Sequence, residues 1–190
     1  MIVNISNKKL NNFLKLYGDK KFLIFGFTSS IYNFLIKELL TKKISNSFCN
    51  GILLHGGGWK KLEKFKISNM QFKKKLLEKI KIKRVINYYG TVEQTGTIFL
   101  ECEICGCFHT NIFADILIRK PNLDLCKKNE PGIVQLVSIL PTSYPGNSIL
   151  LEDEGYLEDK KNHNCQNTGK SFKIIGRIKK AEIRGCSDAT

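Results

Sequence analysis

The chain has 190 residues, of which 42% are hydrophobic and 25% charged, and this composition excludes a disordered or fibrous protein. No run of 18 apolar residues is present, and the first residues lack the charged-then-apolar layout of a secretory signal. We therefore expect a cytoplasmic protein with no membrane span. The seven cysteines are an odd number, and without a signal a disulfide framework is not expected.

The first half of the chain predicts alternating helices and strands. The expected elements, in chain order, are a helix over 8–17, a strand over 21–27, a helix over 31–42 capped by Ser29 or Ser30, a strand over 51–55, a helix from Ser68 to about residue 82 and a strand over 84–88. Strands that alternate with helices are typical of a parallel sheet covered by helices.

The second half predicts strands and no helix. Short strands separated by Pro, Gly and Asn are expected over 97–104, 112–119, 132–140, 147–152 and 172–184. These strands indicate a small antiparallel sheet or barrel. The predicted fold class is thus α/β, with a helix-covered parallel sheet followed by a β-rich subdomain.

The charge is divided unequally between the two halves. Residues 1–97 hold 19 Lys and Arg against 5 Asp and Glu, whereas residues 98–190 hold 12 of each kind. We therefore expect one domain over 1–97 and another over 98–190. The basic half fits either lysine-rich, solvated helix faces or a nucleic-acid-binding surface. Because Arg84 is the only arginine in that half and base readers favour arginine, nucleic acid is the weaker interpretation.

Two motifs follow predicted strands of the first half. Gly56-Gly57-Gly58 ends the strand over 51–55, and glycines allow a backbone to approach a planar ring or a phosphate. Tyr89-Gly90-Thr91-Val92-Glu93 follows the strand over 84–88, so it lies at the sheet edge where ligands bind. There an aromatic ring can stack on a base, and a Glu can reach a phosphate-bound Mg²⁺. Each motif also has a plain structural interpretation: a loop with positive φ, or a surface Tyr with a capping Glu.

Two more motifs lie in the second half. Leu151-Glu152-Asp153-Glu154-Gly155 reads as an acidic turn whose carboxylate accepts both hydroxyls of a ribose. Arg177, after Gly176, is a charge-assisted donor toward a ribose or phosphate oxygen. Each alone is a common turn.

The order of these four motifs resembles that of the acyl-adenylate-forming superfamily. Their fuller wording resembles the LuxE-type acyl-protein synthetases, from about Phe22 to the last residue. The motifs that carry the resemblance are His55-Gly56-Gly57-Gly58-Trp59-Lys60-Lys61, Tyr89-Gly90-Thr91-Val92-Glu93-Gln94-Thr95-Gly96, Ser143-Tyr144-Pro145-Gly146-Asn147-Ser148, Glu152-Asp153-Glu154-Gly155 and Arg184-Gly185-Cys186-Ser187-Asp188.

The resemblance implies an enzyme that uses ATP and Mg²⁺ to convert a long-chain fatty acid into an acyl-adenylate. By position in the motifs, Gly56, Gly57 and Gly58 would line the adenine pocket, Tyr89 and Gly90 would contact adenine, Thr91 and Glu93 would face phosphate and Mg²⁺, and Asp153 and Arg177 would hold the ribose. The acyl group would then pass to a cysteine as a thioester that feeds a fatty-acid reductase.

Cys186, in the closing motif, would be the acyl acceptor. A thiolate is a competent nucleophile toward a mixed anhydride, and Arg184 two residues earlier favours the thiolate. The alternative is a terminal thiol without a role.

One part of the superfamily pattern is missing. A Ser/Thr/Gly-rich loop that grips the ATP phosphates belongs upstream of the glycine run, and Thr28-Ser29-Ser30 is too short for it. The chain corresponds to the second half of the family's length. We therefore expect either a split subunit that pairs with a chain supplying the N-terminal half, or a truncated product or fragment of a longer enzyme. A reductase or acyltransferase protein is a further expected partner. An inactive remnant of such an enzyme is the alternative.

A cluster of cysteines and histidines lies outside these motifs. Cys102, Cys105, Cys107 and His109 fall within eight residues, and His163 and Cys165 come much later. Any four of these six side chains would suit a structural Zn²⁺. Unligated thiols are one alternative, and a basic zinc-containing module that binds nucleic acid is another.

Overall fold

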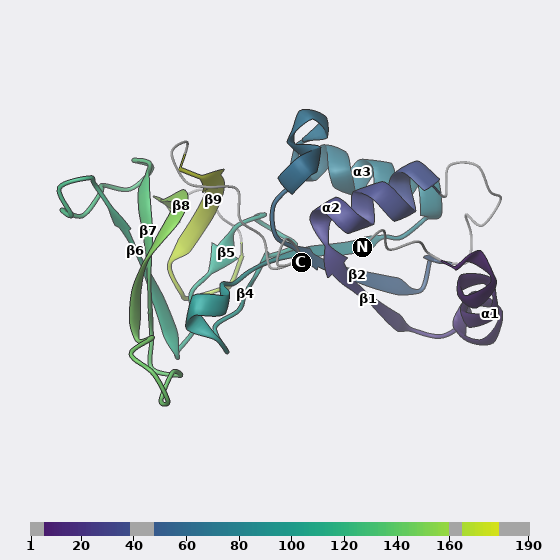
Figure 1. Cartoon of the computed structure of the whole chain (residues 1–190), viewed down its shortest axis with the longest axis horizontal. Coiled ribbons are helices and arrows are strands. Elements are labelled where there is room, and N and C mark those ends of the chain that lie inside the picture. The colour runs from purple at the N-terminus through teal and green to yellow at the C-terminus, as the bar shows by residue number, and fades with distance from the viewer. Residues whose placement is uncertain (1–5, 39–47, 160–164, 179–190) are drawn as a thin grey trace. The chain divides into compact units, whose positions relative to one another are not determined.

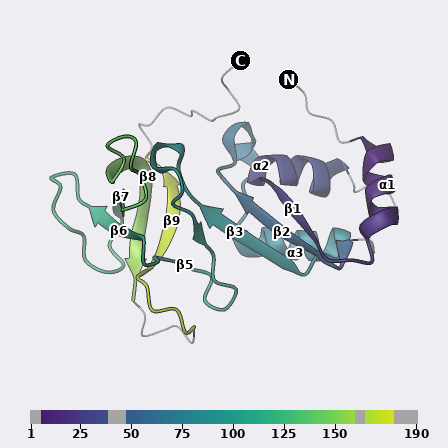
Figure 2. The same cartoon turned by 90° about the horizontal axis from the view of Figure 1, so that it is seen from below.

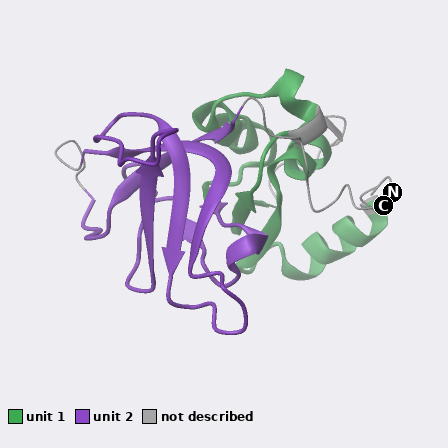
Figure 3. Cartoon of the chain, turned by 60° about the vertical axis from the view of Figure 1, so that its left-hand side comes forward, with its two compact units in different colours: residues 1–87 green, residues 88–190 purple. Residues whose placement is uncertain are grey.

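A computed structural model describes residues 6–38, 48–159 and 165–178 of the chain. The chain forms two compact units, Met1–Asn87 and Tyr88–Thr190, shown in different colours in Figure 3. The unit boundary falls ten residues before the change in charge at residue 97. Hydrogen bonds from Gln94, Thr95 and Thr97 to residues of the second unit explain this position.

The first unit alternates helices and strands. Its elements are α1 (Asn7–Tyr17), β1 (Phe22–Phe27), α2 (Thr28–Ile31), the π-helix η1 (Tyr32–Glu38), β2 (Gly51–Gly56), the 3-10 helix η4 (Lys60–Phe65), α3 (Asn69–Ile80) and β3 (Arg84–Tyr89), whose last two residues belong to the second unit. Ser68 caps α3 in a capping box with Gln71, which explains why the helix begins there.

The first sheet has the strand order β1-β2-β3-β4, and β1 and β2 pair in parallel. Figure 1 shows α2 and α3 on the same side of β1 and β2. Side chains from both helices, η1 and the strands form one core. Its fully buried members include Leu53, Phe72 and Leu76. Side chains pack closely on this face of the sheet and exclude water. This packing fixes the position of β2 and of the glycine run at its end.

The other face of β1 carries large exposed apolar side chains. Burial alternates along the strand, and Leu23, Phe25 and Phe27 are 63%, 64% and 41% exposed. Parallel sheets are normally covered on both faces. Among the described residues, the helices α2 and α3 cover only the opposite face (Figures 1 and 2).

The predicted start of the second helix is wrong. The helix begins at Thr28, directly after β1, and no side chain caps it. Thr28 is buried, and its hydroxyl donates to the carbonyl of Gly56 instead. This contact joins residues 28 positions apart, so the local sequence could not reveal it. Residues 39–42 of the predicted helix lie outside the described residues.

The second unit is built on an antiparallel sheet of order β5-β9-β8-β7-β6. Its elements are the 3-10 turn η5 (Val92–Gln94), β4 (Phe99–Leu100), β5 (Phe108–His109), β6 (Ala114–Arg119), β7 (Gly132–Ser138), β8 (Ser148–Glu158) and β9 (Ser171–Arg177). Figure 2 shows these strands curving around one another. Phe99, Ile116, Leu136 and Phe172 lie at the centre of its core.

The acidic turn predicted at Glu152–Gly155 is wrong, because these residues lie inside the long strand β8. Gly155 is needed there for a close backbone approach rather than a turn, since a Cβ would lie 2.6 Å from the carbonyl oxygen of Lys173. The strand expected over 97–104 is also reduced to β4 and a bridge at Glu101, and the short strand β5 was not predicted. Residues 179–184 of the last predicted strand lie outside the described residues.

The predicted fold class is confirmed: a helix-covered sheet with a parallel pair, followed by an antiparallel β-rich part. No helix appears after residue 97 among the described residues. None of the described helices is long and apolar enough to cross a membrane.

Candidate functional site

Tyr89, Asp153 and Arg177 come together in the second unit, although 64 residues separate the first two. Tyr89 ends β3, and its hydroxyl donates to Asp153 Oδ2 at 2.8 Å. Asp153 lies on β8 directly opposite Arg177 on β9. The Arg177 guanidinium donates to Glu152 Oε2 at 2.9 Å. The structure therefore brings Tyr89, predicted to stack on adenine, together with Asp153 and Arg177, predicted to hold the ribose.

Burial governs the charge at this site. It raises the pKa of Asp153 above the usual range of an aspartate, and the nearby carboxylates of Glu93 and Glu152 act in the same direction. The hydrogen bond from Tyr89 and the charge of Arg177 lower that pKa in part. Burial, together with the charge of Asp153, also raises the pKa of Tyr89 far above its usual value, so Tyr89 remains a donor. The site thus holds a partly buried carboxylate, that of Asp153, which accepts a hydrogen bond from one fixed donor, the Tyr89 hydroxyl.

Removing the Tyr89 hydroxyl should raise the pKa of Asp153 further. In Tyr89→Phe the carboxylate loses a hydrogen bond that favours its charged form, while burial still opposes that form. We expect a pH titration of the Asp153 carboxyl, followed by NMR, to move to higher pH in this variant. Tyr156→Phe, a matched change on β8, is the control and should leave the titration in place. An unchanged or lower pKa in Tyr89→Phe would contradict the assigned hydrogen bond.

The ring of Tyr89 is held by other aromatic rings. It lies 6.5 Å from Phe99, 6.0 Å from Phe108 and 6.3 Å from Phe172, measured between ring centroids. Phe99 and Phe172 are fully buried. The core of the second unit therefore fixes the orientation of the tyrosine, as a stacking surface requires.

Thr91 and Glu93 form the turn that follows Tyr89. A Cβ at Gly90 would lie 3.0 Å from the carbonyl oxygen of Thr97, so this close approach favours glycine. Thr91 caps η5 by accepting from the Glu93 backbone N–H at 3.3 Å, and its hydroxyl donates to the Glu93 carboxylate. Glu93 is exposed, and its charge raises the pKa of both Tyr89 and Asp153. An exposed carboxylate within electrostatic reach of Asp153 suits a hydrated cation at this edge.

Gln94 is a structural residue of the site that its motif did not reveal. It is fully buried, and its Nε2 donates to the Gly146 carbonyl at 2.8 Å. The next residue, Thr95, donates its N–H to the Tyr144 hydroxyl at 3.0 Å. The Tyr-Gly-Thr-Val-Glu-Gln-Thr motif is therefore anchored on the Ser-Tyr-Pro-Gly motif at 143–146. The sequence contains both motifs, but it gives no sign that they contact each other.

The glycine run lies in the first unit and begins with Gly56, the last residue of β2. Gly57 has φ of 73°, a left-handed conformation that favours glycine. A Cβ at Gly58 would meet no atom within 4 Å, so open space surrounds this residue. Gly56 is buried and its carbonyl accepts from Thr28. The run is thus a bare backbone surface at its exposed end, as the lining of a flat pocket requires.

His55, just before the glycine run, is a buried neutral histidine. It is 2% exposed, its Nδ1 lies 2.9 Å from the Thr28 hydroxyl, and its ring centroid lies 4.8 Å from that of Phe72. Its Nε2 has no hydrogen-bond partner among the described residues. Burial, and next the charge of Lys73, lower its pKa to about 4.

The buried His55 should make the first unit less stable in acid. Its folded-state pKa is depressed below the unfolded value, so the unfolded chain binds the proton first as pH falls below about 6.5. We expect the unfolding free energy to lose about 3 kcal/mol from this residue between pH 7 and pH 4. Chemical denaturation of His55→Gln, which cannot titrate, should show a pH dependence flatter by that amount. Parallel curves for the two proteins would contradict the assignment.

Four metal-ligating side chains meet in the second unit. The ligand atoms of Cys102, Cys105, His109 and Cys165 all lie within 4.8 Å of one another. Burial raises the pKa of Cys105 to about 11. For Cys102, burial is outweighed by hydrogen bonds from the backbone of Cys105 and Ile104, so its pKa is lowered. Of the other two candidates, Cys107 is not part of the group, because its thiol donates to the Glu158 carboxylate at 2.8 Å. His163 lies outside the described residues.

The sequence matches the family described as "Acyl-protein synthetase, LuxE" over residues 2–190, almost the whole chain. The chain belongs to the LuxE acyl-protein synthetase family. No curated protein matches it.

Solved structures of adenylate-forming enzymes resemble this LuxE-family chain in fold. An open conformation of 2-hydroxyisobutyryl-CoA ligase, in complex with 2-HIB-AMP and CoA, has a TM-score of 0.71 at 15% identity, over 90% of this chain and 36% of that one. ATP-bound MatB from Rhodopseudomonas palustris has a TM-score of 0.59 at 10% identity, over 93% and 34%. O-succinylbenzoate coenzyme A synthetase from Bacillus subtilis, with ATP and magnesium, has 0.57 at 14%, over 91% and 34%. The chain spans about a third of the length of these structures.

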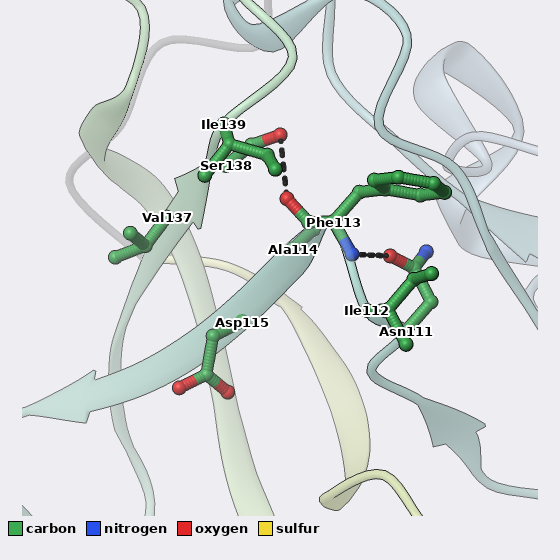
Figure 4. A pocket seen from close by; sticks show the side chains of 8 residues that line it. All are labelled: Asn111, Ile112, Phe113, Ala114, Asp115, Val137, Ser138 and Ile139. Carbon is green, nitrogen blue, oxygen red and sulfur yellow. Dashed lines mark hydrogen bonds between the residues drawn. The ribbon is translucent and has the colours of Figure 1, made fainter.

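The predicted acceptor Cys186 lies outside the described residues. An open hollow at the start of β6 and the end of β7 is shown in Figure 4, and no predicted site residue lines it. Its wall includes Asn111, Phe113 and Ser138, whose hydrogen bonds close the turn before β6. The polar groups of these residues already bond to one another, so we assign the hollow no role in the site.

Proposed function

We propose that this chain is the base- and ribose-binding part of an ATP-dependent acyl-protein ligase. The enzyme would activate a long-chain fatty acid as its acyl-adenylate and transfer the acyl group to a cysteine. The observation that supports this most is the contact of Tyr89 with Asp153 opposite Arg177, because three family motifs far apart in sequence meet there. Family membership supports the class of reaction.

The gathered site suits a nucleoside. The Asp153 carboxylate would accept hydrogen bonds from two ribose hydroxyls, and Arg177 would add a charged donor. The fixed ring of Tyr89 would stack on adenine, with Gly90 beside it as bare backbone. By position in the family motif, Gly56, Gly57 and Gly58 would also contribute bare backbone to adenine binding. ATP and magnesium are bound in solved structures that share this fold, which favours the same pair of cofactors here.

Thr91 and Glu93 would serve the phosphates. A hydroxyl can donate to a phosphate oxygen, and an exposed carboxylate can hold Mg²⁺ through oxygen ligands. The Thr91 hydroxyl now donates to Glu93, so nucleotide and metal would replace this contact. When bound, Mg²⁺ would neutralise charge on the phosphate oxygens.

The reaction would have two steps. In the first, an oxygen of the fatty-acid carboxylate forms a bond to the α-phosphorus of ATP, and the bond to pyrophosphate breaks. In the second, the Cys186 thiolate forms a bond to the acyl carbon, and AMP leaves with the oxygen that joined them. The thiol proton passes to solvent. The product is an acyl thioester on the protein, which a fatty-acid reductase would consume.

The open face of β1 would be covered by the polypeptide that supplies the rest of the adenylating domain. Leu23, Phe25 and Phe27 offer it a row of exposed apolar side chains. The chain spans about a third of the solved structures whose fold it shares, so a large part of such a domain has to come from another segment. That segment would also bring the loop that grips the phosphates, and this chain alone should bind ATP poorly.

Exchange of labelled pyrophosphate into ATP, dependent on a long-chain fatty acid, tests the first step. It should be measured with this chain alone, with the polypeptide that completes the domain alone, and with both. We expect exchange in the mixture and little in either component. The carboxylic acid should be required, and Glu93→Gln should reduce the exchange. A mixture that forms a complex yet shows no acid-dependent exchange would overturn the proposal and favour an inactive remnant.

A further inference from the structure

The four ligand atoms of Cys102, Cys105, His109 and Cys165 form a compact set. All lie within 4.8 Å of one another. Sulfur ligands 2.3 Å from a tetrahedral Zn²⁺ lie about 3.8 Å apart, so a small contraction would close this set around the ion. Three thiols and one imidazole are a common ligand set of structural zinc sites, and soft thiolates exclude Mg²⁺ and Ca²⁺.

The turn between Cys102 and Cys105 is built to point two thiols the same way. The Gly106 N–H donates to the Cys102 carbonyl at 2.8 Å, and the Cys102 N–H donates to the Cys107 carbonyl at 2.8 Å. Gly106 has φ of 68°, which glycine adopts without strain. These contacts close a tight knuckle whose two thiols belong to the set, and they do so independently of any metal.

His109 is oriented toward the thiols from its other side. Its Nε2 lies 3.2 Å from Cys105 Sγ and 3.6 Å from Cys165 Sγ. Its Nδ1 lies 3.3 Å from the hydroxyl of Ser171, which is buried and pairs with His109 across β5 and β9. A hydrogen bond from Nδ1–H to Ser171 would leave the Nε2 lone pair facing the thiols. This second contact, which fixes tautomer and ring, is typical of histidines that bind metals.

The position of the cluster indicates what a metal would do. β5 and β9 pair over only two residues each, Phe108 with Phe172 and His109 with Ser171. Three ligands lie on or just before β5, and Cys165 lies on the segment that leads into β9. A bound ion would tie these two segments together at the edge of the sheet. Phe108 and Phe172 both contact the Tyr89 ring, so the tie would also hold the support of that ring.

We propose that Cys102, Cys105, His109 and Cys165 bind one Zn²⁺ ion at a structural site that joins β5 to the segment before β9. Cys107 is excluded by its bond to Glu158, and Cys126 by its contact with the Pro131 carbonyl. This site does not depend on the proposed ligase activity, because all four ligands are side chains of this chain.

Metal content of the purified full-length chain tests the proposal. Protein produced with ample zinc should carry about one equivalent by mass spectrometry of the elements, and Co²⁺ in its place should show the absorption of a tetrahedral thiolate site. Cys105→Ser and Cys165→Ser should bind zinc at least about tenfold more weakly. Cys107→Ser is the matched control and should keep the full equivalent, because a serine hydroxyl can still donate to Glu158. A wild-type chain whose thiols stay reduced and metal-free in excess zinc would overturn the site.

A second variant keeps the test decisive if the serine variants do not fold. His109→Cys retains four ligands and should bind one equivalent of Co²⁺, with the thiolate-to-cobalt absorption of a fourth sulfur. An unchanged Co²⁺ spectrum, or equal loss of metal in Cys107→Ser and Cys165→Ser, would contradict the assigned ligands. None of these measurements depends on ATP or a fatty acid. The zinc proposal can therefore be refuted while the ligase proposal stands, and the ligase proposal can be refuted while the zinc proposal stands.

Discussion

Asp153→Asn should weaken ATP binding about 100-fold in the complex of this chain with the polypeptide that completes the domain. A charged hydrogen bond contributes about 1.5–3 kcal/mol, so weakening two bonds to the ribose hydroxyls costs about 3 kcal/mol in total. That free energy corresponds to about two powers of ten in the dissociation constant. Isothermal titration calorimetry of wild type and variant measures the difference directly.

The same change should not destabilise the fold. Burial raises the pKa of Asp153, so the folded chain holds its charged form at a cost at neutral pH. That cost is greatest above the raised pKa and declines as pH falls through it, because the folded state then takes up the proton before the unfolded state does. The neutral amide removes the cost, and we expect Asp153→Asn to melt no lower than wild type near pH 7.

Asp124→Asn provides the matched control for this substitution. Asp124 lies on the exposed loop between β6 and β7, where its carboxylate accepts a hydrogen bond from the side-chain amide of Asn122 at 2.8 Å. It should leave ATP binding unchanged. A dissociation constant for Asp153→Asn within about threefold of wild type, a difference of about 0.7 kcal/mol, would contradict the assignment of the ribose to this carboxylate.

Gln94→Ala should lower the unfolding free energy of the second unit by about 3–4 kcal/mol. Gln94 is fully buried, and truncation leaves both a cavity and the Gly146 carbonyl without its donor. The loss should appear as a lower midpoint of chemical denaturation with an unchanged slope. Because the Tyr89 turn is anchored through this side chain, ATP affinity should fall as well.

Gln135→Ala is the control for the glutamine truncation. Gln135 lies half-buried on β7, and its side chain bonds to Arg119 and Ser148 at the surface of the sheet. Water can replace these partners, so the expected loss is under about 1.5 kcal/mol. Equal losses in the two variants would show that Gln94 is not the internal support that its contacts indicate.

Local patterns in the sequence predicted much of the fold. The spacing of apolar residues and the Ser68 cap set α3, and the apolar runs at 22–27 and 51–56 are the parallel pair. The acidic motif was misread because its glycine suggested a turn. In the structure Gly155 accommodates the backbone of Lys173, a neighbour in space that local sequence does not show.

The candidate site was predictable in its members and not in its contacts. The family motifs named Tyr89, Asp153 and Arg177, but their meeting depends on the register of β8 and β9. Gln94 went unrecognised because a glutamine signals burial only through its partners, here the carbonyl of Gly146. Of the six candidate metal ligands, the structure brings four together and turns Cys107 to Glu158, a contact 51 residues away in sequence, while His163 lies outside the described residues.

Transfer of a radioactive long-chain fatty acid to Cys186 tests the central claim most directly. The chain should be incubated with ATP, Mg²⁺ and the labelled acid, together with the polypeptide that completes the domain, and the protein then separated on a denaturing gel. We predict ATP-dependent label on this chain that hydroxylamine removes, as for a thioester, and that is lost in Cys186→Ser but kept in Cys126→Ser. An active complex that forms acyl-adenylate but labels the chain equally in Cys186→Ser would contradict the acceptor. A complex that forms no acyl-adenylate would contradict the ligase itself.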